Sequence, residues 1–355
     1  MLDIFLWLWY NVNDFLGKRF QSDKEAGKIA NIKDVAKMAN VSVATVSRVL
    51  NKTRHVSEEI EKAVLEAARE LGYTPNLLGK NLRQKCTGII LVMMSTLTNS
   101  FCSKVVTGIA NEAEKHNYHI MICATNGLPE KEKIYLGLVK NRMADGMIVL
   151  NSTLSADEMS LISNHAAIVQ CSEYTASENT PFVSIDNGLA AKDACEHLIL
   201  NGRKRILFIG VDNSLISSHL RMEGYRQALS CHGLPFDPGL VLYSNYGYRN
   251  TMRVVDRYLE EGHTFDAVFA ISDRMAAGAV SALRKHGLTV PENIEVIGFD
   301  NTDIAYMVEP PLTTVSQPQT EMGKRAFSIL YDKLNGGEPE NVILPHKLIV
   351  RKSAK

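Results

Sequence analysis

The sequence predicts a multidomain protein with a small all-α head, a short linker and a two-lobed α/β body. Two short amphipathic helices flank a tight turn in residues 32–51. From Gly88 onward, apolar runs alternate with amphipathic stretches in two successive series. The charge is also uneven: residues 28–85 hold 11 Lys and Arg against 6 Asp and Glu, whereas residues 86–355 hold 25 against 29. A basic head on a mildly acidic body suggests that only the head binds nucleic acid.

Residues 1–28 form a leader that matches neither a membrane span nor a signal peptide. The run MLDIFLWLWY at its start is apolar and aromatic, but it is too short to span a bilayer. It also lacks the basic start and the small-residue cleavage site of a secretory signal. We expect a disordered leader or a mis-annotated gene start, with a membrane-binding or partner-binding helix as the alternative.

Residues 32–51 have the pattern of two helices across a tight turn. Apolar residues recur at helical spacing in residues 32–39. Asn40 can adopt the left-handed backbone that ends a helix, and Ser42 is a good N-cap for the next one. The second helix leaves small, hydroxyl and cationic side chains outward: Ala44, Thr45, Ser47, Arg48 and Asn51. Such a face suits a DNA major groove, and a helical hairpin with a merely solvated face is the alternative.

A third helix is expected after the next loop, with Ser57 as its N-cap and Gly72 at its end. Three apolar stripes can make one small core, which bounds the head at residues 29–75. Pro75 then stops the helix from continuing. Residues 76–87, NLLGKNLRQKCT, are polar and lack a core stripe. They predict a hinge linker that can become helical.

The body, residues 88–355, predicts two similar lobes. Its apolar runs are residues 88–94, 119–125, 145–151 and 167–171 in the first series, and 205–210, 241–244, 267–272 and 295–300 in the second. Buried runs that alternate with helices predict a parallel sheet covered on both faces, and two series predict two lobes. Ligands of such sheets bind at the carboxyl ends of the strands. We therefore expect the binding site in a cleft between the lobes.

The sequence contains no motif of an enzyme, a metal site or a cofactor site. There is no GxSxG elbow, GxGxxG loop or P-loop, and the ten histidines and six cysteines are dispersed without metal-ligand spacing. Scattered cysteines without a CxxC pair indicate a reduced, cytoplasmic protein. We therefore expect no catalytic residue, no metal and no cofactor.

Residues 41–51, VSVATVSRVLN, resemble the DNA-binding headpiece of the LacI/GalR (lactose-repressor) family of bacterial transcription regulators almost letter for letter. The body resembles the core of that family, which is like a periplasmic sugar-binding protein. The matching phrases are residues 98–101, 145–148, 221–225, 272–276, 298–301, 311–315 and 317–318. The resemblance covers about residues 30–352 and implies three crossings between the lobes, near 184, 315 and 340. The first lobe would then hold about residues 88–183 and 316–339, and the second about 184–315 and 340–352.

By this resemblance, Val43, Ala44 and Arg48 occupy the base-reading positions of the second helix. An arginine can donate two bonds to a guanine edge, and Val43 and Ala44 can pack on thymine methyl groups. His55 lies in a loop that often reaches the groove, with an ordinary loop histidine as the alternative. Further residues are placed for phosphate contacts, which fix register without reading sequence: Thr45, Ser47, Asn51, Ser57 and Asn76.

The linker resembles the hinge helix of the family, which folds when two chains meet on the operator. Leu82 stands where the family has a leucine that wedges into the minor groove and kinks the duplex. Gly79 stands where alanine is commoner, and it weakens such a helix by about 1 kcal/mol. The resemblance implies a homodimer on a palindromic double-stranded operator, because a two-fold dimer reads two half-sites. A tetramer stays open.

The same resemblance implies a small effector in the cleft. Arg221 would clamp a hydroxyl pair or a carbonyl, Asp300 would accept from sugar hydroxyls, and Tyr246 would stack on the ligand ring. The alternatives are that Arg221 pairs with Asp273 and that Tyr246 is ordinary surface. The other expected effector residues are Phe101, Gln170, Asp186 and Ser272.

Several positions depart from the sugar-responsive pattern of the family. Ser272 replaces an asparagine, residues 95–96 replace a Pro-Asp pair, and Gln170 replaces a frequent acid. Fewer acidic groups mean fewer acceptors for a polyhydroxylated ring, so a nucleoside stays an alternative to a sugar as the effector. The pair Ser272-Asp273 and Gly79 resemble, in part, the cytidine-responsive branch.

The whole sequence thus predicts a cytoplasmic, ligand-controlled regulator that is associated with the nucleoid when it is bound to DNA. We expect a repressor of a catabolic operon whose effector, a sugar in preference to a nucleoside or purine, shifts the closure of the cleft and so the meeting of the hinge helices. The alternative is a global regulator controlled mainly by a protein corepressor, which a binding surface on the first lobe would distinguish. An enzyme, a periplasmic binding protein and a membrane protein are not expected.

Overall fold

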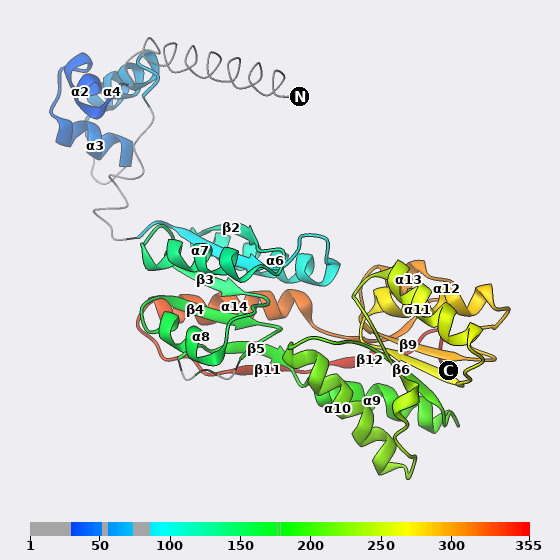
Figure 1. Cartoon of the computed structure of the whole chain (residues 1–355). Coiled ribbons are helices and arrows are strands. Elements are labelled where there is room, and N and C mark those ends of the chain that lie inside the picture. Colours follow the sequence, from blue (N-terminus) through cyan, green and yellow to red (C-terminus); the bar gives the residue numbers. More distant parts are fainter. Residues whose placement is uncertain (1–29, 52–55, 74–85, 176, 178) are drawn as a thin grey trace, which may run out of the picture. The chain divides into compact units, whose positions relative to one another are not determined.

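The computed structural model describes residues 30–51, 56–73, 86–175, 177 and 179–355. The chain divides into two compact units, residues 1–85 and residues 86–355 (Figure 1). The first unit contains the head, and the second contains both lobes, so the body begins at Cys86, two residues earlier than expected.

The head is a bundle of three helices, α2 (Ile32–Met38), α3 (Val43–Asn51) and α4 (Glu58–Glu70). Asn31 caps α2 in a reciprocal capping box with Asp34. Asn40 has the expected positive φ of 51° in the turn before α3. The apolar stripes of the three helices meet in one core, made of Val35, Ala36, Val46, Val49, Val64, Ala67 and Ala68. The helix stripes predicted from the sequence are therefore confirmed.

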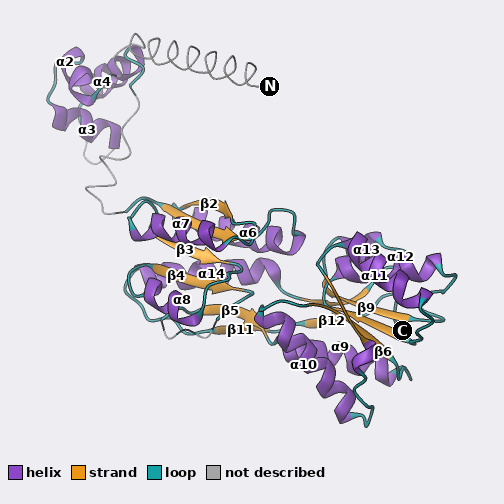
Figure 2. Ribbon diagram, in the orientation of Figure 1, coloured by secondary structure: helices purple, strands orange, loops and turns teal. Residues whose placement is uncertain are grey.

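The first lobe is a parallel sheet between two helix pairs (Figure 2). Its strands, in spatial order, are β11 (Val342–Leu344), β5 (Phe182–Ile185), β4 (Ala167–Cys171), β3 (Gly146–Val149), β1 (Ile89–Met94) and β2 (His119–Ala124). Its helices are α6 (Ser100–Lys115), α7 (Pro129–Lys140), α8 (Ala156–Ser163) and α14 (Gln319–Leu334). Alternate side chains of β1 enter opposite cores, with Ile90 in the core that includes α6 and α14 and Leu91 in the core of α7 and α8.

The second lobe repeats this architecture. Its strands, in spatial order, are β12 (Lys347–Ile349), β10 (Thr313–Ser316), β9 (Glu295–Asp300), β8 (Ala267–Ala270), β6 (Ile206–Val211) and β7 (Val241–Ser244). Its helical elements are α9 (Asn187–Leu200), α10 (Ile216–Cys231), the 3-10 turn η1 (Pro238–Leu240), α11 (Tyr248–Glu260), α12 (Asp273–Lys285) and α13 (Ile304–Met307). β12 runs antiparallel to β10, and the other pairs are parallel.

The chain crosses between the lobes three times, and only the third crossing lies clearly later along the sequence than expected. The crossings follow β5, β10 and β11, so they lie after residues 185, 316 and 344. The third boundary, expected near 340, is corrected, because β11 pairs in parallel with β5, with Ile343 opposite Ser184. Residues 342–344 therefore belong to the first sheet, and only the segment from β12 onward returns to the second. No helix in the described ranges is long and apolar enough to cross a membrane.

Candidate functional site

The outer face of α3 carries the predicted base-reading residues. Val43, Ala44 and Arg48 are all exposed, while Val46 and Val49 on the opposite face are buried. Ser42 fixes the start of the helix, because its Oγ accepts the Thr45 backbone N–H at 3.1 Å. A rigid helix thus presents an aliphatic side chain, a methyl group and an arginine together.

The predicted phosphate contacts are described only in part. The Thr45 hydroxyl lies 2.9 Å from the Ser42 hydroxyl, so it already has a partner within the head. Ser47 is half-buried on α3. Ser57 is exposed at the N-cap of α4, but its side chain makes no capping bond, which corrects the expectation of a side-chain cap. The other predicted positions lie outside the described residues or lack a described side chain: Asn51, His55, Asn76 and Leu82.

The body holds a cavity of about 360 Å³ between its two lobes. Its lining residues follow the carboxyl ends of the strands, as the sheet topology requires. The first lobe contributes Ser95, Thr96, Thr98, Phe101, Glu132, Asn151 and Glu173, among others, and the second contributes Asn213, Ser217, Arg221, Tyr246, Ser272, Asp273 and Asp300. Hydroxyls, amides, carboxylates and aromatic rings therefore face one space.

Arg221 is buried in the wall of this cavity, and three neighbouring residues contact its guanidinium. Its Nε donates to Asn187 Oδ1 at 2.9 Å, and its Nη1 donates to the Ile271 carbonyl at 2.7 Å. The guanidinium lies 3.6 Å from the centroid of the Phe299 ring. The alternative pairing with Asp273 is not formed, so the guanidinium is positioned for the cavity.

Asp273 and Asp300 form an acidic pair in the second lobe. Asp273 accepts from the Thr302 backbone N–H at 2.6 Å and from the Thr314 hydroxyl at 2.5 Å. Burial, with the nearby charge of Asp300, raises the pKa of Asp273 to about 7. Asp300 has a positive φ of 101° and accepts from Gln317 Nε2 at 2.7 Å. Burial also raises the pKa of Asp300, and the Arg221 guanidinium opposes this rise.

Three more predicted effector residues line the cavity. Tyr246 is 38% exposed, and its hydroxyl lies 3.2 Å from Ser218 Oγ. Phe101 is buried at the start of α6. The Ser272 Oγ accepts the Met275 N–H at 3.3 Å as the N-cap of α12. The structure thus brings Tyr246, Phe101 and Ser272 together with Arg221 and Asp300.

Gln170 and Asp186, by contrast, are not among the residues that line the cavity. The Gln170 carboxamide is buried and bound to a loop, since it accepts the Thr175 N–H at 2.9 Å and donates to the Thr175 carbonyl at 3.0 Å. Asp186 caps α9 through the Leu189 N–H at 2.8 Å. Both side chains are therefore used by the fold, which corrects the expectation that they face the effector.

Two carboxylates of the first lobe line the cavity but were not predicted from the sequence. Glu132 is buried on α7 and accepts from Ser152 Oγ at 2.7 Å. Glu173 accepts from both the N–H and the hydroxyl of Ser217 at the start of α10, so it links the two lobes. Its position just after the apolar run 167–171 is the signal that could have identified it. The cavity is thus richer in acids than the sequence suggested.

Further contacts join the lobes beside the cavity. Lys104 Nζ lies 2.9 Å from Asp303 Oδ1, and Arg274 donates to the Thr98 carbonyl at 2.9 Å. Together with the Glu173–Ser217 bonds, they cross from the first lobe to the second. The Lys104–Asp303 pair is largely exposed, and such pairs are individually weak. The Lys104–Asp303 pair therefore adds little to the free energy that holds the lobes together.

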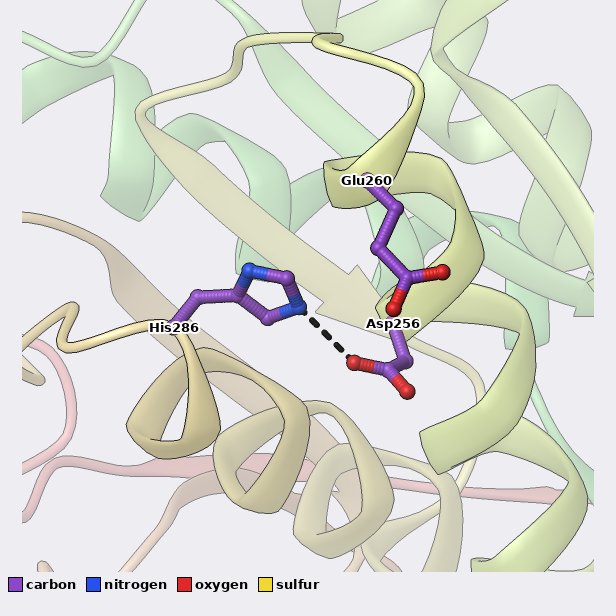
Figure 3. A group of neighbouring side chains, drawn as sticks. All are labelled: Asp256, Glu260 and His286. Atoms are coloured by element: carbon purple, nitrogen blue, oxygen red, sulfur yellow. Dashed lines mark hydrogen bonds and ion pairs between the residues drawn. The ribbon is translucent and has the colours of Figure 1, made fainter.

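A separate cluster on the second lobe consists of Asp256, Glu260 and His286 (Figure 3). Asp256 and Glu260 come from α11, and His286 follows α12. His286 Nε2 lies 2.8 Å from one Asp256 oxygen, and Lys285 Nζ lies 2.6 Å from the other. Lys285 and His286 hold the pKa of Asp256 below its usual value. Because the Lys285 ammonium is already paired with the Asp256 carboxylate, we explain the cluster as an ion-paired link between α11 and α12.

Comparison with known proteins matches both units. Residues 31–76 match the family model of bacterial regulatory proteins, lacI family, and residues 195–354 match that of a periplasmic binding protein-like domain. The HTH-type transcriptional repressor CytR of Escherichia coli K12 is 35% identical over 314 residues, or 88% of this chain and 92% of the relative. The HTH-type transcriptional repressor PurR of Vibrio parahaemolyticus is 31% identical over 331 residues, or 92% of this chain and 99% of the relative.

Solved structures match over the same length. The lac repressor dimer bound to operator and the anti-inducer ONPF has a TM-score of 0.81 at 26% identity, covering 92% of this chain and 99% of its own. The complex of the transcriptional regulator CelR with cellobiose has a TM-score of 0.70 at 29% identity, covering 92% and 100%. These relatives are transcriptional regulators and not enzymes.

Proposed function

The chain belongs to the lacI family of bacterial regulatory proteins and is a DNA-binding transcriptional repressor, and on this premise we propose that it controls a catabolic operon through a palindromic operator bound as a dimer. The observation that carries the proposal is the joint exposure of Val43, Ala44 and Arg48 on α3. An arginine beside two small apolar groups can read a guanine next to thymines. The net charge of +5 over residues 28–85 supports the binding of phosphates.

The proposed dimer is supported by exposed apolar side chains of the body. Met121 and Ile122 are 53% and 48% exposed on β2, which is the edge strand of the first sheet. Unpaired edges with apolar side chains are rarely left open to water, and a second copy of the chain would cover this one. The operator-bound lac repressor is a dimer, and it covers nearly all of this chain. Two heads would then read two half-sites.

We further propose that the cavity binds a sugar, with a nucleoside as the alternative. Its volume of about 360 Å³ lies within the range of about 300–1,000 Å³ for small-molecule sites. Arg221 offers donors, Asp300 and Glu173 offer acceptors, and the ring of Tyr246 offers a stacking surface. Both a hexose and the ribose of a nucleoside match these groups. Solved relatives hold cellobiose in one case and ribose in another.

The effector would act by changing the closure of the two lobes. A ligand shifts a conformational equilibrium only by its differential affinity for the two states. Here Glu173 and Ser217 contribute to the cavity and are also bound to each other across the lobes. An effector that engages these groups changes the free energy of closure, and in this proposal closure sets how the chain meets its operator in the cytoplasm.

Selection from randomised duplex DNA with the full-length chain tests the DNA part of the proposal. We expect enrichment of a palindrome, and Arg48→Ala should remove the sequence preference while a salt-sensitive background stays. Unchanged preference in that variant would refute the assignment of α3. A thermal-shift panel of D-ribose, cellobiose and cytidine tests the cavity, because a bound compound raises the melting temperature by mass action. A shift with cytidine alone would favour the nucleoside.

A further inference from the structure

The body begins at Cys86, and one carboxylate holds its first three residues. Asp145 Oδ1 accepts the Thr87 N–H at 2.7 Å, and Asp145 Oδ2 accepts the Gly88 N–H at 2.8 Å. The Cys86 thiol donates to Oδ2 as well, with Sγ 3.1 Å away. Such charge-assisted bonds are stronger than neutral ones. Three successive residues are thus bound to a single side chain.

The same segment is fixed to its neighbours by the backbone. Asp145 donates its own N–H to the Ile89 carbonyl at 2.9 Å, and the Gly88 carbonyl accepts the His119 N–H at 2.8 Å. Gly88 has a positive φ of 69°, so the chain bends sharply here before β1. The start of the body is therefore tied to the strands on both sides of β1.

In the second lobe, another aspartate just before a strand also accepts two successive backbone N–H groups. Asp266 precedes β8 as Asp145 precedes β3, and its carboxylate accepts the N–H groups of Lys204 at 2.8 Å and Arg205 at 2.9 Å. Its own N–H donates to the Arg205 carbonyl at 3.0 Å. The segment that Asp266 binds follows α9 of the same lobe. The chain that enters at Cys86 comes from the linker to the head.

We propose that Asp145 is a positioning residue for regulation, which fixes the end of the linker to the first lobe so that a movement of the lobe is passed to the operator-reading head. The inference rests on the proposed function. Without the anchor, residues 86 and 87 would lengthen the segment that joins the head to the body, because only the backbone bonds from Gly88 onward would remain. A longer tether lowers the effective concentration of the second head once the first is bound. A longer tether also absorbs a movement of the first lobe that a tether with a fixed end would transmit to the head.

Asp266, which makes the corresponding bonds in the second lobe, supplies a matched control. Asp145→Asn keeps the shape of the side chain but replaces one acceptor by a donor that faces backbone N–H groups. Asp266→Asn makes the same change in the lobe that carries no linker. We expect both variants to lower the melting temperature of the body alike. Only Asp145→Asn should weaken binding of the selected palindromic duplex, by about tenfold, which corresponds to about 1.4 kcal/mol.

The thiol gives a second, independent readout. Cys86 is half-buried, Cys231 is exposed, and the remaining four cysteines are buried. In a Cys231→Ser background, iodoacetamide should label Cys86 slowly in the otherwise unchanged chain, faster in Asp145→Asn, and at the unchanged rate in Asp266→Asn. Cys86→Ser keeps a donor to Asp145 and should bind the duplex normally, whereas Cys86→Ala loses it and should bind more weakly.

The outcomes separate this inference from the proposed function. If the unchanged chain selects no palindrome, the proposed function fails, and equal labelling of Cys86 in the two Asp→Asn variants then refutes the anchor as well. If the unchanged chain binds and both Asp→Asn variants weaken binding equally, Asp145 acts only through stability and the inference is overturned. If Asp145→Asn does not fold, Cys86→Ala against Cys86→Ser decides, and equal binding by these two overturns the inference.

Discussion

Arg221 is the side chain whose surroundings define the proposed effector site most clearly. Two of its donors are bonded to Asn187 and to the Ile271 carbonyl, and its plane lies against Phe299. A guanidinium fixed in this way is already oriented before a ligand arrives, so little entropy is lost on binding. Its position beside Asp300 places a donor next to an acceptor, as a pair of neighbouring hydroxyls requires.

Arg221→Ala should therefore remove the response to the effector. We expect the thermal shift caused by the active compound of the panel to disappear, while operator binding without effector stays within about threefold of the original. The variant should also lose about 2–4 kcal/mol of stability, because Asn187 Oδ1 and the Ile271 carbonyl lose their donor. Arg226→Ala is the control, since Arg226 is exposed on the same helix. A retained shift in Arg221→Ala would contradict this role.

The raised pKa of Asp273 predicts how the stability of the folded protein depends on pH. Its pKa of about 7 in the folded protein lies above its ordinary value of 3.8, so the folded state favours the protonated form. The stabilisation is fully present below pH 3.8 and is lost as the pH rises through 7. Melting temperatures of the original chain should fall from pH 6 to pH 8. Asp273→Asn, which cannot ionise, should flatten this fall, and an unchanged slope would show that another group causes it.

Most of the effector residues predicted from the sequence line the cavity, whereas Gln170 in the first lobe was misplaced. Arg221, Asp300 and Tyr246 line the cavity as expected. Gln170 was expected there too, but its carboxamide satisfies the backbone of Thr175. Whether a polar side chain serves a loop or a ligand depends on contacts between distant residues, which one sequence does not show.

At the scale of elements, two glycines allow α6 and α14 to pack closely. A Cβ on Gly323 would lie 2.0 Å from the Val105 carbonyl oxygen, and one on Gly108 would lie 2.1 Å from the Thr320 carbonyl oxygen. The backbones of the two helices therefore touch at reciprocal positions. This contact fixes the return of the chain to the first lobe after its second crossing.

Gly323→Ala should separate these helices and destabilise the body by about 1–3 kcal/mol. The matched control is Gly137→Ala on α7, where an added Cβ would meet no atom within 4 Å. That change should stabilise the helix by up to about 1 kcal/mol, because glycine is a poor helix former. Urea unfolding of both variants is the measurement. Equal effects of the two substitutions would mean that the close packing is not needed.

The alternation of apolar runs and helices predicted the two sheets, because such long periodic segments leave few other folds. It did not place the third crossing. β11 and β12 have three residues each, and their assignment to different sheets depends on pairing with β5 and β10. Partners so far away in sequence leave no local pattern, and strands this short carry little periodicity of their own.

At the scale of the whole molecule, the proposed dimer predicts a change of assembly. Lysines in place of Met121 and Ile122 would put charge on the exposed edge of the first sheet. We expect the double variant to elute as a monomer in size-exclusion chromatography with light scattering, and to bind the palindrome much more weakly. Leu200→Lys is the control, because Leu200 is also an exposed apolar residue. An unchanged dimer in the double variant would exclude β2 from the interface.

In the proposed mechanism, a ligand in the body controls DNA binding by the head. The most direct measurement is the affinity of the full-length chain for its selected palindrome, with and without the compound of the panel that raises its melting temperature. We expect the dissociation constant to change by about fivefold or more, and to stay constant in Arg221→Ala. A compound that stabilises the chain in the thermal-shift assay but leaves operator affinity unchanged would show that the cavity does not control DNA binding.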